Sequence, residues 1–173
     1  MRYTAEDILN EREKRVIFQQ NLMLIHKKPL VFIRANFPGV NKDNSLTEKI
    51  IKVIDKCVTD IFSRDIVIKI HRITAEGPNT VLIINKELID IKSLTLQIED
   101  KHPLGRFVDI DVYNPHTFMS ISRTSLGYDP RECYICSDLA HNCIREGRHD
   151  INTIIDFINK SYINYSRSFY ERK

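Results

Sequence analysis

The stretch IVIKIHRITAEGPNTVLII, residues 66–84, decides the fold class of this chain. Apolar and polar residues alternate from Ile66 to Ile73, which is the pattern of a strand with one buried face. Gly77-Pro78-Asn79 predicts a turn, and Thr80–Ile84 predicts the strand that returns from it. A hairpin at this place makes an antiparallel or mixed sheet the centre of the fold.

Further strands are expected before and after this hairpin. Before it, Leu30–Ile33 is a short apolar run. After it, the segments Leu94–Ile98 and Phe107–Tyr113 alternate, and Phe118–Ser122 follows an Asn-Pro turn. The middle of the chain is therefore predicted to build the sheet.

Helical spacing of apolar residues marks both ends of the chain and one internal segment. Thr4–Ile25 and Ile151–Phe169 carry apolar stripes, and the internal helix begins at a capping box of Ser45 and Glu48. The prediction is an α+β fold in a single domain over residues 1–173. Its mixed or mostly antiparallel sheet is flanked by N- and C-terminal helices.

Composition limits the classes of function. The chain has 173 residues, 42% of them hydrophobic and 28% charged, with a net charge of +3. This charge is too small to indicate nucleic-acid binding, and no apolar run is long enough to span a membrane. The first fifteen residues are polar and charged, unlike a secretory signal. We therefore expect a cytoplasmic protein with reduced cysteines that binds neither nucleic acid nor membrane.

Two aspartates, Asp109 and Asp111, lie in the predicted strand Phe107–Tyr113. Because strand side chains alternate between faces, both carboxylates point to the same side. Their repulsion favours a bound cation, and Mg²⁺ prefers such oxygen ligands together with substrate phosphates. Glu99, which ends the preceding predicted strand, is a candidate third carboxylate that would act as metal ligand or base. The alternative is an acidic strand edge that discourages aggregation.

Residues suited to phosphate binding lie around this pair in the sequence. Arginine offers a planar set of donors, glycine permits close backbone approach, and helix starts favour anions. Each residue taken alone also fits an ordinary surface position. Beside two carboxylates that bind a metal, they predict a substrate-binding set of Gly39, Lys42, His102, Gly105, Arg106, Arg123 and Arg131.

Three cysteines and a histidine follow the spacing C-x2-C-x6-C-x5-H: Cys133, Cys136, Cys143 and His149. This spacing is compatible with a zinc site. However, no glycine or proline interrupts the cysteines, which predicts one helix with Cys133 and Cys143 about 15 Å apart. One zinc ion could not reach both, since its bonds to sulfur are about 2.3 Å. We therefore disfavour zinc and expect reduced cysteines that line a buried helix face near the site.

Two segments resemble a known family. The stretch HPLGRFVDIDV, from His102 to Val112, is similar to the signature of apo-citrate lyase phosphoribosyl-dephospho-CoA transferases. The segment Arg131–His149, with its three cysteines, is similar to a second part of that family. Looser similarity is found at Glu11–Arg15 and around Pro38-Gly39, so the resemblance extends over nearly the whole chain.

The resemblance implies an enzyme, a nucleotidyltransferase that forms a single catalytic domain. Its donor would be 2'-(5''-triphosphoribosyl)-3'-dephospho-CoA, its acceptor a serine of the citrate lyase acyl carrier protein, and its leaving group pyrophosphate. Related malonate decarboxylase enzymes imply a nucleotidyltransferase-like fold, although Gly105-Arg106 stands where that fold has a glycine-serine pair. Two alternatives stay open. One is the same transfer onto the malonate decarboxylase carrier protein, and the other is a non-catalytic module that binds zinc or nucleic acid.

Overall fold

The computed structural model describes residues 3–170, which form two compact units that divide after Ile121. We call residues 3–121 the sheet unit and residues 122–170 the C-terminal unit, and each is a body of its own. A single catalytic domain over residues 1–173 stays a prediction, as does the cytoplasmic location. Among the described helices, none has the length and apolar character that crossing a membrane requires.

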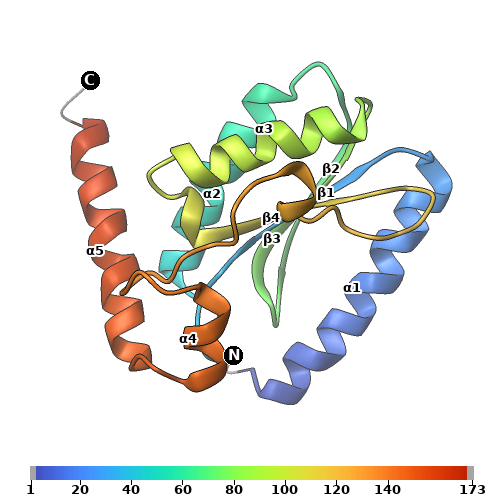
Figure 1. Cartoon of the computed structure of the whole chain (residues 1–173). Helices are drawn as coiled ribbons and strands as arrows, with labels where there is room; N and C mark the ends of the chain where they lie inside the picture. Colours follow the sequence, from blue (N-terminus) through green and yellow to red (C-terminus); the bar gives the residue numbers. More distant parts are fainter. Residues whose placement is uncertain (1–2, 171–173) are drawn as a thin grey trace. The chain divides into compact units, whose positions relative to one another are not determined.

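The sheet unit contains a four-stranded antiparallel sheet (Figure 1), which confirms the predicted fold class. Its strands are β1 (Leu30–Ala35), β2 (Ile66–Thr74), β3 (Gly77–Ile84) and β4 (Val108–Tyr113). They lie in the order β2-β3-β1-β4, so β4 is an edge strand that pairs with β1. The nucleotidyltransferase-like arrangement stays a prediction.

The hairpin turn lies at Ala75 and Glu76, not at the predicted Gly77-Pro78-Asn79. Pro78 fits inside β3 because the pairing of β3 with β1 begins only at Asn79, so the missing N–H of proline leaves that ladder intact. The prediction took proline and glycine as turn residues, whereas here they begin the strand. The turn thereby places Glu76 at the end of the hairpin, beside the candidate site.

Three helices flank the sheet: α1 (Ala5–His26), α2 (Ser45–Ile61) and α3 (Leu88–Lys101). The α1 helix packs on one face, and α2 and α3 lie together on the other (Figure 1). A capping box of Thr4 and Asp7 begins α1. The capping box of α2 is formed by Asn44 and Thr47, one residue earlier than predicted.

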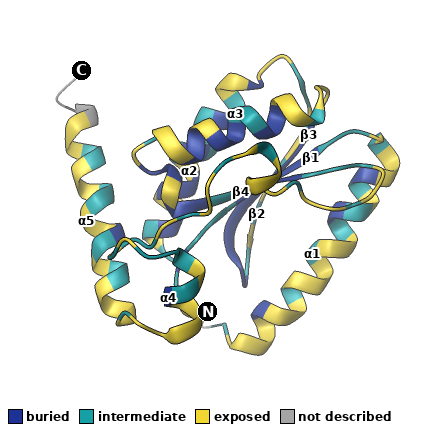
Figure 2. Ribbon diagram, in the orientation of Figure 1, coloured by how far each residue is buried: buried dark blue, intermediate teal, exposed yellow. Residues whose placement is uncertain are grey.

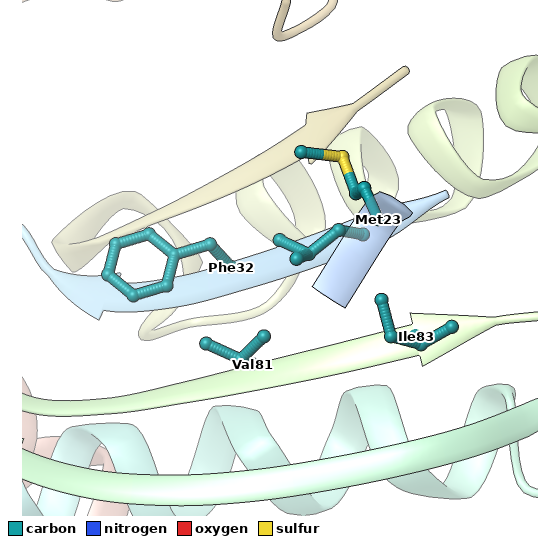
Figure 3. Close-up of a cluster of buried hydrophobic side chains, with 5 residues drawn as sticks. Met23, Phe32, Val81 and Ile83 are labelled. Carbon is teal, nitrogen blue, oxygen red and sulfur yellow. The ribbon is translucent and has the colours of Figure 1, made fainter. Parts of the chain in front are cut away.

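The core under α1 holds the sheet together at the point where the site is built. Figure 3 shows Met23 of α1 against Phe32 of β1 and Val81 and Ile83 of β3, a cluster that also includes Leu30. Every residue of β3 is buried (Figure 2). Burying one side chain of this size contributes about 1.5–3 kcal/mol, so the strands that carry the site are firmly placed.

Two predicted strands are wrong. Residues 94–98 lie within α3, whose buried face mixes apolar residues with Lys92, Thr95 and Glu99. Those buried polar residues hide the helical period when only apolar residues are followed. Phe118–Ser122 forms no strand but only an isolated bridge between Ser120 and Tyr113.

The C-terminal unit contains a short 3-10 helix, η2 (Thr124–Leu126), and the helices α4 (Ala140–Glu146) and α5 (Ile151–Tyr170). The C-terminal helix was predicted at this place and is confirmed. The helix predicted through Cys133, Cys136 and Cys143 is wrong, because α4 begins only at Ala140. Residues 133–138 form a loop that an antiparallel bridge between Glu132 and Leu139 closes.

Candidate active site

The pairing of β1 with β4 places charged residues side by side on the sheet face that α1 covers. Arg34 is opposite Asp109, and Phe32 is opposite Asp111. In β4 the two aspartates alternate with buried apolar residues, as predicted, so both carboxylates lie on the same face. Arg34 Nη2 lies 3.1 Å from Asp109 Oδ2. The face therefore brings a carboxylate pair next to an arginine from the neighbouring strand.

A buried glutamate connects three arginines on this face. Glu76 is 4% exposed, and its carboxylate accepts a hydrogen bond from Arg15 Nε at 2.7 Å. The same carboxylate lies 3.5 Å from Arg12 Nε and 3.8 Å from Arg34 Nη1. Arg15 also lies over the ring of Phe32, with 4.7 Å between its guanidinium carbon and the ring centroid. The α1 helix is thereby tied to β1 and to the hairpin turn.

Lys42 reaches this face from the loop between β1 and α2, in which Gly39 has a positive φ of 72°. The loop packs closely on the hairpin: a Cβ on Gly77 would lie 2.4 Å from the Lys42 carbonyl oxygen. Burial lowers the pKa of Lys42, and the positive charges of Arg34 and Arg12 lower it further. A bound anion would relieve this repulsion. We call the whole set the charged face: Arg12, Arg15, Arg34, Lys42, Glu76, Asp109 and Asp111.

Asp111 is half-buried, as is Asp109. Burial raises the pKa of Asp111; the charge of Arg34 opposes this effect, and the charge of Asp109 adds to it. Within residues 3–170 the Asp111 carboxylate has no hydrogen-bond or ion-pair partner. A desolvated carboxylate without a donor is costly unless a cation is bound. This position therefore fits a metal ligand.

Glu99 lies on α3 and not at the end of a strand. Its Oε1 accepts a hydrogen bond from the Ile110 N–H at 2.8 Å, and Lys92 Nζ donates to the Ile110 carbonyl at 3.2 Å. Both bonds satisfy backbone groups of the edge strand β4, between the two aspartates. Glu99 therefore holds β4 against α3, and its predicted role as ligand or base stays a prediction.

The segment before β4 contains three predicted substrate-binding residues. His102 ends α3, its Nδ1 accepts from the Leu104 N–H at 3.0 Å, and burial lowers its pKa. Arg106 is exposed in a short 3-10 helix, η1 (Gly105–Phe107). Gly105 is buried against α3, where a Cβ would lie 2.1 Å from the Ile98 carbonyl oxygen. The glycine is needed here for contact with the backbone of α3, and its predicted part in substrate binding stays a prediction.

Gly105→Ala is expected to lower the free energy of unfolding by about 3 kcal/mol, because the new methyl overlaps backbone atoms that cannot move independently of α3. Urea denaturation followed by circular dichroism measures the change. Gly127→Ala is the control: no atom lies within 4 Å of the new Cβ, so only its positive φ should cost about 1 kcal/mol. Equal stability of Gly105→Ala and the parent protein would show that η1 can shift freely.

The other predicted arginines, Arg123 and Arg131, belong to the C-terminal unit. The carbonyl of Arg131 accepts a hydrogen bond from the Ala140 N–H at 2.9 Å, so the start of α4 fixes its backbone. Of the predicted site residues, the structure thus groups Lys42 with Asp109 and Asp111. The substrate-binding roles of all seven residues stay predictions.

Four residues of the charged face were missed by sequence reasoning: Arg12, Arg15, Arg34 and Glu76. A signal existed for the first two, because they continue the helical spacing of the buried α1 residues Ile8, Gln19 and Met23. Arg34 directly follows the apolar run Leu30–Ile33, which is a weaker signal. Glu76 carried none, since its role depends on a hairpin turn that was predicted two residues too late.

The C-terminal unit holds a possible Cys3His metal site. One ligand atom from each of Cys133, Cys136, Cys143 and His149 lies within 4.8 Å of the others. The predicted separation of about 15 Å assumed a continuous helix, and that helix does not exist. The geometric reason for disfavouring zinc is therefore wrong.

Comparison with known proteins identifies a family. Residues 3–165 match the family described as apo-citrate lyase phosphoribosyl-dephospho-CoA transferase. The Shigella flexneri serotype 5b protein of that name is 29% identical over 153 residues, which cover 87% of this chain and 83% of the relative.

Two longer relatives match as well. Protein CitXG of Leuconostoc mesenteroides subsp. cremoris is 28% identical over 96% of this chain, and Protein CitXG of Haemophilus influenzae is 30% identical over 90% of it. The chain spans only 36% and 34% of the length of these two proteins. Their remaining length lies outside the similarity.

Proposed function

The chain belongs to the apo-citrate lyase phosphoribosyl-dephospho-CoA transferase family, and we propose that it carries out the transfer for which the family is named. The donor is 2'-(5''-triphosphoribosyl)-3'-dephospho-CoA, and the acceptor is a serine of the citrate lyase acyl carrier protein. The serine hydroxyl loses its proton to solvent as its oxygen bonds to the phosphorus next to the ribose. The bond from that phosphorus to the two outer phosphates breaks, and pyrophosphate leaves. The observation that carries this proposal is the charged face, with two aspartates among four cations.

Asp109 and Asp111 would hold a magnesium ion. Both side chains offer hard oxygen ligands from the same strand face, and the Asp111 carboxylate has no other partner among the described residues. Bound Mg²⁺ would neutralise negative charge on the transferred and leaving phosphates. Glu99 supports the strand from behind, so we leave it out of the proposed ligand set.

The cations of the charged face would bind the triphosphate. Arg34 is the central one, since it lies 3.1 Å from Asp109 and also faces Glu76. Arg15 is held by Glu76 and by the ring of Phe32, so its guanidinium is oriented before any substrate arrives. Pre-oriented donors stabilise the charge of a departing pyrophosphate without reorganisation.

The test is transfer itself. Purified protein is incubated with the donor, Mg²⁺ and the apo form of the citrate lyase acyl carrier protein, and intact-mass spectrometry follows the carrier. The carrier should gain the mass of the phosphoribosyl-dephospho-CoA group, with one pyrophosphate released per carrier. A parallel reaction with the malonate decarboxylase carrier protein separates the two acceptors. An unmodified citrate lyase carrier, with donor and Mg²⁺ present, would overturn the proposal.

Arg106→Ala is expected to raise KM for the donor at least tenfold, because losing one charge-assisted hydrogen bond to phosphate costs about 1.5–3 kcal/mol. Arg106 is exposed in η1, directly before β4, so its removal should lower the free energy of unfolding by no more than about 1 kcal/mol. Arg64→Ala is the matched control, since Arg64 is also exposed but precedes β2 at the far edge of the sheet. Unchanged kcat/KM for the donor would identify Arg106 as an ordinary surface residue.

A further inference from the structure

The backbone of the C-terminal unit is folded around three cysteines and a histidine. Cys133 begins a tight loop, where its N–H donates to the Asp138 carbonyl at 2.7 Å. The Glu132–Leu139 bridge closes this loop, and α4 begins directly after it. Cys136 is thereby held in the loop, while Cys143 faces it from the first turn of α4.

A glycine turns the chain back so that the histidine joins the cysteines. Gly147 ends α4 with a left-handed φ of 57°. The N–H of the next residue, Arg148, donates to the Cys143 carbonyl at 3.1 Å. This reversal places His149 Nε2 3.4 Å from Cys136 Sγ.

We propose that Cys133, Cys136, Cys143 and His149 bind one structural Zn²⁺ ion. Tetrahedral zinc, with bonds of about 2.3 Å to sulfur and 2.0–2.1 Å to nitrogen, holds its ligand atoms about 3.6–3.8 Å apart. The Cys136 and Cys143 sulfurs are 3.5 Å apart, and all four ligand atoms lie within 4.8 Å of one another. To reach this geometry, the farthest pair of ligand atoms has to approach by no more than about 1 Å. Four protein ligands leave no position for substrate, so the ion is structural.

The surroundings suit a zinc thiolate centre of net negative charge. The Ile135 N–H points at Cys133 Sγ at 3.4 Å, and such donors stabilise a thiolate. Three thiolates and Zn²⁺ carry a net charge of −1, and Arg148 lies within electrostatic range of Cys143. Arg148 Nη1 is itself held 2.6 Å from Asp138 Oδ2, at the end of the cysteine loop. Soft sulfur ligands in tetrahedral arrangement select zinc over magnesium or calcium.

The C-terminal unit also has little else to hold it together. Among its residues with described burial, 122–168, only Cys143 and Ile158 are buried. Figure 2 shows α4 and α5 mostly in the colours of exposed and intermediate residues. Small units without an adequate apolar core rely on disulfides or metals, and none of the four cysteines, all of them in the described part of the chain, forms a disulfide. A zinc ion supplies the missing cross-link between the loop, α4 and the segment before α5.

Metal analysis of the full chain, with its affinity tag removed, tests this proposal without any donor or carrier. Mass spectrometry of the elements should find about one zinc per chain and neither iron nor copper. Cobalt added after zinc removal should give the sulfur-to-cobalt charge-transfer bands of a tetrahedral thiolate site. Zinc removal with a thiol reagent and a chelator should lower the helical circular dichroism signal and open the segment 122–170 to protease. These readouts stand even if the proposed transfer fails.

Matched variants assign the ligands. Cys143→Ser and His149→Ala should reduce zinc to below about 0.1 per chain, whereas Cys57→Ser and His141→Ala should retain it. Cys57 lies on α2 and His141 is exposed on α4, so each control removes the same chemistry outside the cluster. Should a ligand variant prove insoluble, the zinc content and cobalt spectrum of the parent protein decide. A metal-free parent chain, a disulfide within the cluster, or zinc retained by Cys143→Ser would overturn the proposal.

Discussion

Asp111→Asn is expected to reduce transfer to the carrier by at least a thousandfold. A metal ligand stabilises the transition state by several kcal/mol, and each 1.36 kcal/mol corresponds to about a factor of ten in rate. Asn keeps the shape of the side chain but lacks the charge that Mg²⁺ requires. Asp109→Asn should act in the same direction, with the added loss of the ion pair to Arg34. Pyrophosphate release at saturating donor measures both variants.

In the absence of metal, the Asp111→Asn variant should be at least as stable as the parent protein. Burial raises the pKa of Asp111 above its ordinary value of 3.8, so the folded chain binds this proton more tightly than the unfolded chain. The resulting cost to stability begins as pH rises past 3.8 and is complete above the raised pKa. At neutral pH the full cost is present, and Asn removes it.

Thermal unfolding with and without Mg²⁺ therefore separates a metal ligand from a structural residue. Mg²⁺ should raise the Tm of the parent protein but not that of Asp111→Asn, because an ion stabilises only a fold that binds it. Asp60→Asn is the control. Asp60 forms an exposed ion pair with Lys56 on α2, so this substitution should change neither the rate nor the Tm. Substantial turnover by Asp111→Asn would contradict the assignment. An Asp111→Asn protein that is unfolded without Mg²⁺ would contradict it as well.

The sheet could be predicted because its strands carry their pattern locally. Apolar and polar residues alternate in Ile66–Ile73 and in Phe107–Tyr113, and β2 and β4 show the matching alternation of burial. Asp109 and Asp111 lie on the same face of the sheet for this reason. α3 was misread because its buried face includes Lys92 and Glu99. Both side chains are buried because they form hydrogen bonds with backbone groups at the edge of β4. This requirement comes from the tertiary structure, so the spacing of apolar residues in the helix does not reveal it.

The cysteine segment shows a different limit of sequence reasoning. The prediction of a continuous helix relied on the absence of glycine and proline between Cys133 and Cys143. The break is made instead by hydrogen bonds from Cys133 and Ala140 that close a loop. Such bonds compete with helix formation wherever the loop gains additional contacts, and ligand geometry can supply them. Spacing alone was therefore a better guide to the proposed metal site than predicted secondary structure.

Glu76→Gln is expected to destabilise the sheet unit by about 3 kcal/mol, because removing one partner of a buried ion pair leaves the other charges uncompensated. Glu76 is 4% exposed and is the shared partner of Arg12, Arg15 and Arg34. Glutamine has nearly the same volume and still accepts a hydrogen bond, so packing is preserved. The loss of unfolding free energy would therefore report the effect of the missing charge and not the effect of a cavity.

Glu11→Gln is the matched control for this change. Glu11 also links α1 to the sheet, through one ion pair of 2.7 Å to Arg72, and should cost about 1 kcal/mol. Urea denaturation of both variants gives the two free energies. A change in Glu76→Gln no larger than in Glu11→Gln would show that solvent already neutralises the three arginines.

A second substitution shows whether Glu76 acts through Arg15. In the double variant with Arg15→Met, part of the loss should be recovered, since the most buried of the three arginines no longer lacks a partner. Because Glu76 orients arginines that would bind the triphosphate, Glu76→Gln should also raise KM for the donor more than it lowers kcat. Asp111→Asn should do the opposite, since a metal ligand acts mainly in the transition state. This contrast, if measured, would assign Glu76 as a positioning residue and Asp111 as part of the reacting centre.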